Sequence, residues 1–181
     1  MGGTIHAIPA SCHDDPRFRR LIAFAEDVLA VCETAGVEPV MDGGLALQVH
    51  LGGAPFAVRD VDFGCPEADF PRLDQGLRAA GIVCEIQPWH VLQARRDDLK
   101  VEFGAREVWN QGLGGPYEAV RIGRFAVAMM HRDGLREQYR RGVAALAADV
   151  DDPQPEKHAR NVAKLAALDA MLAPPDRHDQ A

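Results

Sequence analysis

The chain has 181 residues, of which 47% are hydrophobic and 26% are charged, and its formal net charge is −7. This length is typical of one compact domain with a sizeable core, and the composition is that of an ordinary globular protein. The negative charge argues against broad, sequence-independent nucleic-acid binding, which depends on Lys and Arg contacts to phosphates. No apolar run approaches the roughly 18 residues that span a bilayer, so we expect no membrane partner.

Cysteine spacing and the first residues indicate a cytoplasmic protein. The four cysteines show no Cys-x-x-Cys spacing, which argues against a disulfide framework and fits a reduced compartment. Residues 1–10 lack the basic region and apolar stretch of a signal peptide. The cysteines are Cys12, Cys32, Cys65 and Cys84.

The first predicted element is a long helix that follows a flexible lead-in over residues 1–13. Asp15 and Pro16 form a typical helix start, with an acidic N-cap and a proline at the first helical position. Between residues 18 and 32, apolar side chains recur at steps of three and four, which marks one buried face. Gly36 is expected to end this helix, which we interpret as a structural element packed on a sheet.

The rest of the chain is organised around the stretch 40–63. A strand is predicted over 37–41, and the Gly43-Gly44 pair lets the backbone turn tightly at the start of a short helix. Gly52-Gly53 then ends that helix. Glycines at a helix start let backbone N–H groups approach a triphosphate, aided by the helix dipole. The alternative is that Gly43-Gly44 is only a turn.

Two aspartates lie on the next predicted strand, over residues 58–63. Side chains two apart in a strand point the same way, so Asp60 and Asp62 share one face. Carboxylates this close repel each other unless a cation lies between them. Mg²⁺ is commonly held by one or two carboxylates together with substrate phosphates. The pair therefore predicts a magnesium site, and the alternative is an ordinary solvated strand face.

A third acid, Glu102, is predicted on the polar face of the strand 99–103, together with Lys100. Two readings compete with a metal-binding role for Glu102: Lys100 could pair with it at the surface, or Glu107 could be the third acid. The other expected elements are a helix over 69–80, strands over 82–87, 89–94 and 119–128, and helices over 134–148, capped by Asp133, and 156–172.

In their order along the chain, these features resemble the nucleotidyltransferase superfamily, specifically its minimal branch. That branch includes aminoglycoside and lincosamide nucleotidyltransferases and several toxin–antitoxin enzymes. Its pattern is Gly-Gly or Gly-Ser at a helix start, then an Asp-x-Asp or Asp-x-Glu strand, then a third acid on a later strand. Gly43-Gly44, Asp60-Val61-Asp62 and Glu102 match it in that order.

The resemblance implies an α/β (α+β) fold with a short mixed sheet, helices on one side and a C-terminal helical pair. We expect a nucleotidyltransferase core over 14–130, helices packed on it over 131–172, and a disordered tail over 173–181.

The resemblance also implies transfer of an NMP group from an NTP to an acceptor hydroxyl, with release of pyrophosphate. Two Mg²⁺ ions would be bridged by Asp60 and Asp62, and Glu102 would complete the catalytic metal's coordination. The acceptor is expected to be a small molecule. The alternatives are a catalytically silent nucleotide-binding or antitoxin-like protein of the same fold, or a toxin that modifies tRNA or a protein.

Several basic residues are candidate triphosphate ligands. Arg59 adjoins the aspartate pair, and Arg132, Arg136 and Arg140 share one helix face because they are spaced four apart. The alternative for this stripe is a solvated surface, with Glu137 as an ion-pair partner. Relatives often carry a Lys-Asp pair near the last helix, but here Lys157-His158 has histidine in place of the acid, so no role is carried over to it.

Overall fold

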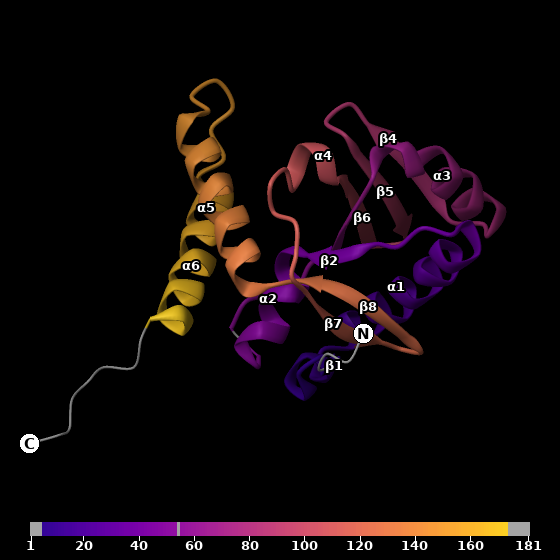
Figure 1. Ribbon diagram of the computed structural model, residues 1–181, viewed down its shortest axis with the longest axis horizontal. Helices are drawn as coiled ribbons and strands as arrows, with labels where there is room; N and C mark the ends of the chain where they lie inside the picture. Colours follow the sequence, from indigo (N-terminus) through magenta and orange to yellow (C-terminus); the bar gives the residue numbers. More distant parts are fainter. Residues whose placement is uncertain (1–4, 54, 174–181) are drawn as a thin grey trace, which may run out of the picture.

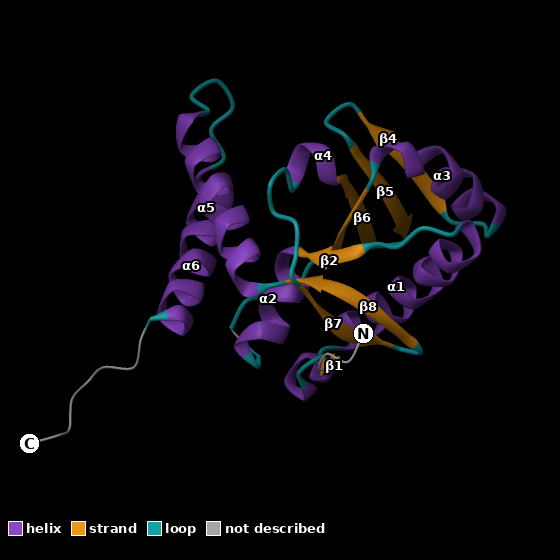
Figure 2. Ribbon diagram, viewed as in Figure 1, coloured by secondary structure: helices purple, strands orange, loops and turns teal. Residues whose placement is uncertain are grey.

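A computed structural model of the chain describes residues 5–53 and 55–173, and in this part eight strands form one mixed sheet (Figures 1 and 2). Their order across the sheet is β1-β7-β8-β2-β3-β6-β5-β4. The α/β class predicted from the sequence is confirmed. The strands are β1 (Ile5–Ala7), β2 (Val40–Asp42), β3 (Val61–Cys65), β4 (Val83–Gln87), β5 (Val91–Arg96), β6 (Leu99–Ala105), β7 (Tyr117–Ile122) and β8 (Phe125–Met130).

The predicted long helix is α1 (Pro16–Ala35), and its ends are as expected. The Asp15 carboxylate accepts a hydrogen bond from the Arg17 backbone N–H at 2.8 Å, and Gly36 ends the helix with a left-handed φ of 65°. The other helices are α2 (Gly43–Leu51), α3 (Phe70–Ala79), α4 (Arg106–Trp109), α5 (Arg132–Ala148) and α6 (Pro155–Leu172), with 3-10 turns η1 (Ala10–Asp14) and η2 (Glu67–Asp69).

The core lies between the sheet and the helices α1 and α3. Alternate residues of β3 and β6 face it, and the rings of Phe63 and Phe103 stack there with centroids 5.4 Å apart. Because side chains alternate along a strand, burial of these rings turns the even-numbered neighbours to the opposite face. Those neighbours are Asp62, Gly64, Lys100, Glu102 and Gly104.

This opposite face is covered in part by α4, which corrects the expectation of helices on one side only. Two glycines make the close approach possible. A Cβ atom at Gly64 would lie 2.7 Å from Asn110 Nδ2 and 2.9 Å from Arg106 Cγ, and one at Gly104 would lie 3.1 Å from Trp109 Cδ1. The helix and the loop after it therefore rest on the backbone of β3 and β6.

Three local predictions differ from the structure. Part of the expected flexible lead-in is ordered, because residues 5–7 form β1 and pair in parallel with β7; three residues are too few for a strand pattern to be recognised. The segment expected as one strand over 119–128 is the hairpin of β7 and β8. The N-cap of α5 is His131 and not Asp133. The expected disordered tail falls almost entirely on residues 174–181, outside the described part of the chain.

The helices α5 and α6 pack against each other and against α2, which lies between them and the sheet (Figure 1). Few of their side chains are buried: Leu135 and Tyr139 of α5, and Leu168 of α6. Within residues 5–53 and 55–173, no helix combines the length and apolar character needed to cross a bilayer.

Gly64→Ala should lower the free energy of unfolding by about 1–3 kcal/mol, the usual cost of forcing an extra methyl group into packed space. Denaturant-induced unfolding measures the difference. Gly114→Ala is the matched control, since no atom lies within 4 Å of a Cβ at that position. Equal unfolding free energies for the two variants would contradict the packing of α4 on β3.

Candidate active site

Three carboxylates predicted from the sequence meet on the sheet face opposite the core. β3 and β6 are parallel neighbours whose register sets Asp62 beside Glu102, and Asp60 immediately precedes β3. One oxygen from each of the three lies within 4.8 Å of the others. Glu107, the alternative third acid, lies on α4, where its carboxylate accepts a hydrogen bond from the Glu67 backbone N–H at 3.2 Å.

Lys100 supplies a positive charge inside this cluster. Its Nζ lies 3.1 Å from Asp60 Oδ2 and 3.1 Å from Glu102 Oε1. Partial burial lowers the pKa of Lys100, but the two carboxylates outweigh that effect and leave the pKa raised. The pairing of Lys100 with Glu102 therefore exists, and it is part of the acidic cluster rather than an alternative to it.

The Gly43 backbone comes close to Asp62. A Cβ atom at Gly43 would lie 2.1 Å from Asp62 Oδ2, and the φ of 62° is also one that glycine adopts most easily. Burial raises the pKa of Asp62 well above its usual value, and the charges of Asp60, Asp42 and Glu102 raise it further, with Lys100 opposing them. The negative charge of the cluster is therefore only partly compensated by the protein.

Asp42 is a fourth acid, which the sequence analysis did not identify. It is only 6% exposed and is the cross-strand neighbour of Asp62 in the β2–β3 pair. Its Oδ2 accepts hydrogen bonds from Asn110 Nδ2 at 2.8 Å and from Gln138 Nε2 at 3.2 Å. Burial raises the pKa of Asp42, although both hydrogen bonds oppose the shift. The sequence feature that could have identified Asp42 is its position directly before Gly43-Gly44.

Glu102 is held in place by a chain of hydrogen bonds from β5. The buried Gln93 donates from Nε2 to Glu102 Oε1 at 2.5 Å, and Arg95 Nη2 donates to Gln93 Oε1 at 2.5 Å. Gln93 lies directly opposite Glu102 in the β5–β6 register. The sequence predicts this segment as the strand over 89–94 but assigns no role to Gln93.

Lys164 of α6 reaches the start of α2. Its Nζ would lie 3.7 Å from a Cβ at Gly44, and it lies 5.3 Å from the centre of the Tyr139 ring. Burial lowers the pKa of Lys164, while the charges of Asp62 and Asp60 partly oppose the shift. Lys157, the nearest sequence match to the lysine of the family's Lys-Asp pair, is exposed and makes no ion pair within the described residues.

The predicted phosphate-binding arginines fall in two different places. Arg59 lines a cavity of about 450 Å³ together with Asp60, Lys100 and Arg160. Arg136, in contrast, is ion-paired with Asp169. Arg140 is ion-paired with Glu137 at 2.6 Å. Contact of Arg136 or Arg140 with a triphosphate stays a prediction, and it requires these ion pairs to break.

The donor set suits a hard divalent cation. Asp60, Asp62 and Glu102 offer only oxygen ligands, which Mg²⁺ and Mn²⁺ prefer over softer donors. Burial is the largest cause of the raised pKa of Asp62, and the neighbouring carboxylates that raise it further also favour a cation there.

No family model and no curated protein matches this sequence. Solved structures do match in fold. The solution structure of the antibiotic-resistance factor ANT(2'')-Ia has a TM-score of 0.61 and 17% identity, over 84% of each chain. A crystal structure of ANT(2'')-Ia in complex with adenylyl-2''-tobramycin has a TM-score of 0.55 and 12% identity, over 84% of this chain and 89% of that one.

An antigenic nucleotidyltransferase-like protein from Paracoccidioides brasiliensis also matches, with a TM-score of 0.54 and 12% identity, over 88% of this chain and 78% of its own. At these identities the likeness shows the fold alone. The chain has the nucleotidyltransferase superfamily fold, which confirms the resemblance seen in the sequence.

Asp62→Asn should raise the melting temperature of the metal-free protein near neutral pH. The raised pKa means that ionising Asp62 costs more in the folded than in the unfolded state. The increase in melting temperature should vanish as the pH falls from the raised pKa of folded Asp62 to the usual pKa of aspartate, because Asp62 is then protonated in both states. Each kcal/mol corresponds to about 2–4 °C at this chain length.

Stabilisation by Mn²⁺ with a non-hydrolysable NTP should be lost in the same variant. Thermal unfolding with and without these ligands measures both effects. Asp151→Asn, at an exposed position without ion pairs among the described residues, is the control. Unchanged Mn²⁺-dependent stabilisation in Asp62→Asn would remove Asp62 from the metal site.

Proposed function

We propose that this protein transfers a nucleotidyl group from an NTP to an acceptor hydroxyl, using divalent metal ions held by Asp60, Asp62 and Glu102. The observation that carries the proposal is the convergence of these carboxylates within 4.8 Å, beside the glycine start of α2, in a nucleotidyltransferase fold. In the reaction, the acceptor oxygen forms a bond to the α-phosphorus while the bond to the pyrophosphate oxygen breaks. The acceptor's proton is released to a base.

The nucleotide's phosphates are assigned to the start of α2. Backbone N–H groups at a helix N-terminus bind anions, and the nine-residue α2 begins with Gly43-Gly44. Lys164 Nζ faces Gly44, and Arg59 and Arg160 line the adjacent cavity. Lys164 and Arg160 lie on α6, and Arg59 directly precedes Asp60.

The acids and their supporting residues have distinct roles in this proposal. Bound divalent ions, two by analogy with the fold, would neutralise charge on the entering and leaving oxygens. Gln93 fixes the orientation of Glu102, which accepts the proton of the acceptor hydroxyl. Lys100 balances the charge of Asp60 and Glu102 in the absence of metal and is free to turn towards a phosphate oxygen once they bind a cation.

The test is incubation of the protein with each NTP, Mg²⁺ and a panel of hydroxyl-bearing small molecules, followed by measurement of pyrophosphate and by mass spectrometry. Mass spectrometry of the protein in the same samples detects self-modification. Metal-dependent NTP binding without any pyrophosphate would favour the silent nucleotide-binding alternative, and absence of NTP binding would contradict the proposal.

Lys164→Ala should weaken NTP binding by about ten- to a hundred-fold, because a charge-assisted contact to phosphate contributes roughly 1.5–3 kcal/mol. NMP binding should change little, since the contact is to the β- and γ-phosphates. Calorimetry with non-hydrolysable NTP and with NMP measures both. Lys157→Ala, on the same helix, is the control and should bind NTP like the wild type. Equal losses in the two lysine variants would count against the assignment of Lys164.

Glu102→Gln should reduce turnover by about a hundred-fold or more, the usual contribution of a general base, and should weaken NTP binding far less. Steady-state pyrophosphate release and NTP calorimetry separate the two quantities. Glu38→Gln, at an exposed loop position, controls for loss of one negative charge. If turnover of Glu102→Gln stays within a few-fold of wild type, the third acid is elsewhere, and Glu107 is the next candidate.

A further inference from the structure

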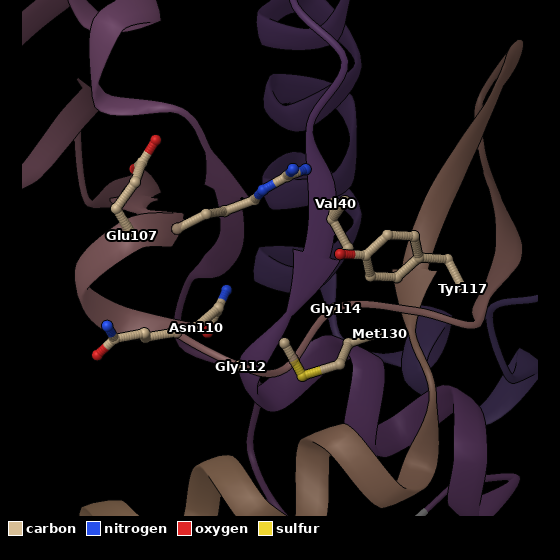
Figure 3. Close-up of a pocket in the computed structure, with 9 residues that line it drawn as sticks. Val40, Glu107, Asn110, Gly112, Gly114, Tyr117 and Met130 are labelled. Atoms are coloured by element: carbon tan, nitrogen blue, oxygen red, sulfur yellow. The ribbon is translucent and has the colours of Figure 1, made fainter.

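A second cavity, of about 420 Å³, lies between α4 with its following loop and the strands β2, β7 and β8 (Figure 3). Its volume is in the range of small-molecule sites. The walls combine apolar and polar groups: Val40 and Met130 on one side, the Tyr117 ring, and the polar side chains of Arg106 and Asn110. In Figure 3, the Tyr117 ring points into the space between the strands and α4.

This cavity adjoins the acidic cluster. Val40 precedes Asp42 by two residues on β2, so the two side chains lie on one face, roughly 7 Å apart along the strand. Asn110 lines the cavity and also donates a hydrogen bond to Asp42 at 2.8 Å. A molecule bound against Val40 therefore lies beside Asn110 and the Asp42 carboxylate that Asn110 holds, and Asp62 is the cross-strand neighbour of Asp42.

Arg106 supplies a free positive charge to the cavity. Its methylene groups lie over Gly64 and it is half-buried, and within residues 5–53 and 55–173 its guanidinium makes no ion pair or hydrogen bond. Glu107 also lines the cavity and carries a negative charge, but it forms no ion pair with Arg106 among the described residues, and its carboxylate is directed to the Glu67 backbone N–H, from which it accepts a hydrogen bond at 3.2 Å. Figure 3 shows Glu107 on the opposite side of the cavity from Tyr117.

We propose that the acceptor is a small hydroxyl-bearing molecule that carries an anionic group, a phosphate or a carboxylate, and binds in this cavity. The inference rests on the proposed nucleotidyl transfer. The anion pairs with Arg106, whose planar guanidinium suits either group. An apolar or planar part of the molecule packs between Tyr117 and Val40, which leaves the hydroxyl towards the acids. A cationic acceptor would instead place its charge against Arg106.

The test compares four probes that share a benzyl alcohol framework: 4-(hydroxymethyl)benzoate, 4-(hydroxymethyl)phenyl phosphate, benzyl alcohol and 4-(hydroxymethyl)benzylamine. Their binding to the full chain with Mn²⁺ and non-hydrolysable NTP is measured by ligand-observed NMR. We expect at least one anionic probe to bind ten-fold or more tightly than the neutral and cationic ones. The stronger of the two anionic probes distinguishes a carboxylate from a phosphate.

Arg106→Gln should remove this preference, whereas Arg121→Gln, on the same strand as Tyr117 but outside the cavity, should keep it. Circular dichroism verifies that both variants are folded, and Tyr117→Leu provides a second variant that should weaken all four probes. No preference for anions in the wild type would overturn the inference. A preference lost in Arg59→Gln rather than Arg106→Gln would also overturn it, by placing the anion in the other cavity.

Failure of this inference can be distinguished from failure of the proposed function. Nucleotidyl transfer stands or falls on metal-dependent NTP binding and pyrophosphate release, which the Lys164 and Glu102 variants probe. If those measurements succeed while the anionic probes show no preference, only the acceptor class is wrong. If NTP does not bind at all, the proposed function fails first, and the acceptor assignment fails with it.

Discussion

Repulsion among four carboxylates is the constraint on which the rest of the structure depends. Burial of Phe63 and Phe103 against the helices of the core directs Asp62 and Glu102 to the same opposite face. Asp42 joins them across the β2–β3 pair, and Asp60 lies at the entry to β3. The sheet gains its stability from the apolar side, which allows it to hold an unfavourable concentration of charge on the other.

Each neighbour of the cluster moderates that charge in a different way. Lys100 compensates it directly, the amides of Asn110 and Gln138 bind the most buried carboxylate, and Gln93 orients Glu102. None of these groups removes the charge, since the pKa of Asp62 stays raised. In the proposed function, this partial compensation would favour the binding of added cations, because a cation between the carboxylates relieves their mutual repulsion.

The sequence predicted those members of the cluster that lie two residues apart on one strand. The two-residue period placed Asp60 with Asp62 and Glu102 with Lys100, and cap residues gave both ends of α1. Three site residues were missed because their roles arise from contacts between elements. Asp42 lies beside Asp62 through the antiparallel β2–β3 register, and Gln93 lies beside Glu102 through the β5–β6 register. Lys164 reaches the site from α6, near the C-terminal end of the described chain. The edge strand β1 was missed for a related reason, since three residues form a strand only because β7 offers them an edge.

The sparse attachment of α5 and α6 has a consequence for ligand affinity. Gln138 and Lys164 reach the acids from these two helices, yet only Leu135, Tyr139 and Leu168 among the described residues of the pair are buried. If a nucleotide binds at the start of α2 as proposed, docking of the helical pair and occupancy of that site are linked equilibria. A bound nucleotide would favour the docked position of the helical pair by some factor. By reciprocity, a substitution that loosens the pair would weaken nucleotide binding by up to the same factor. Under the proposed function, the buried residues Leu135, Tyr139 and Leu168 would thus influence nucleotide affinity without touching the nucleotide.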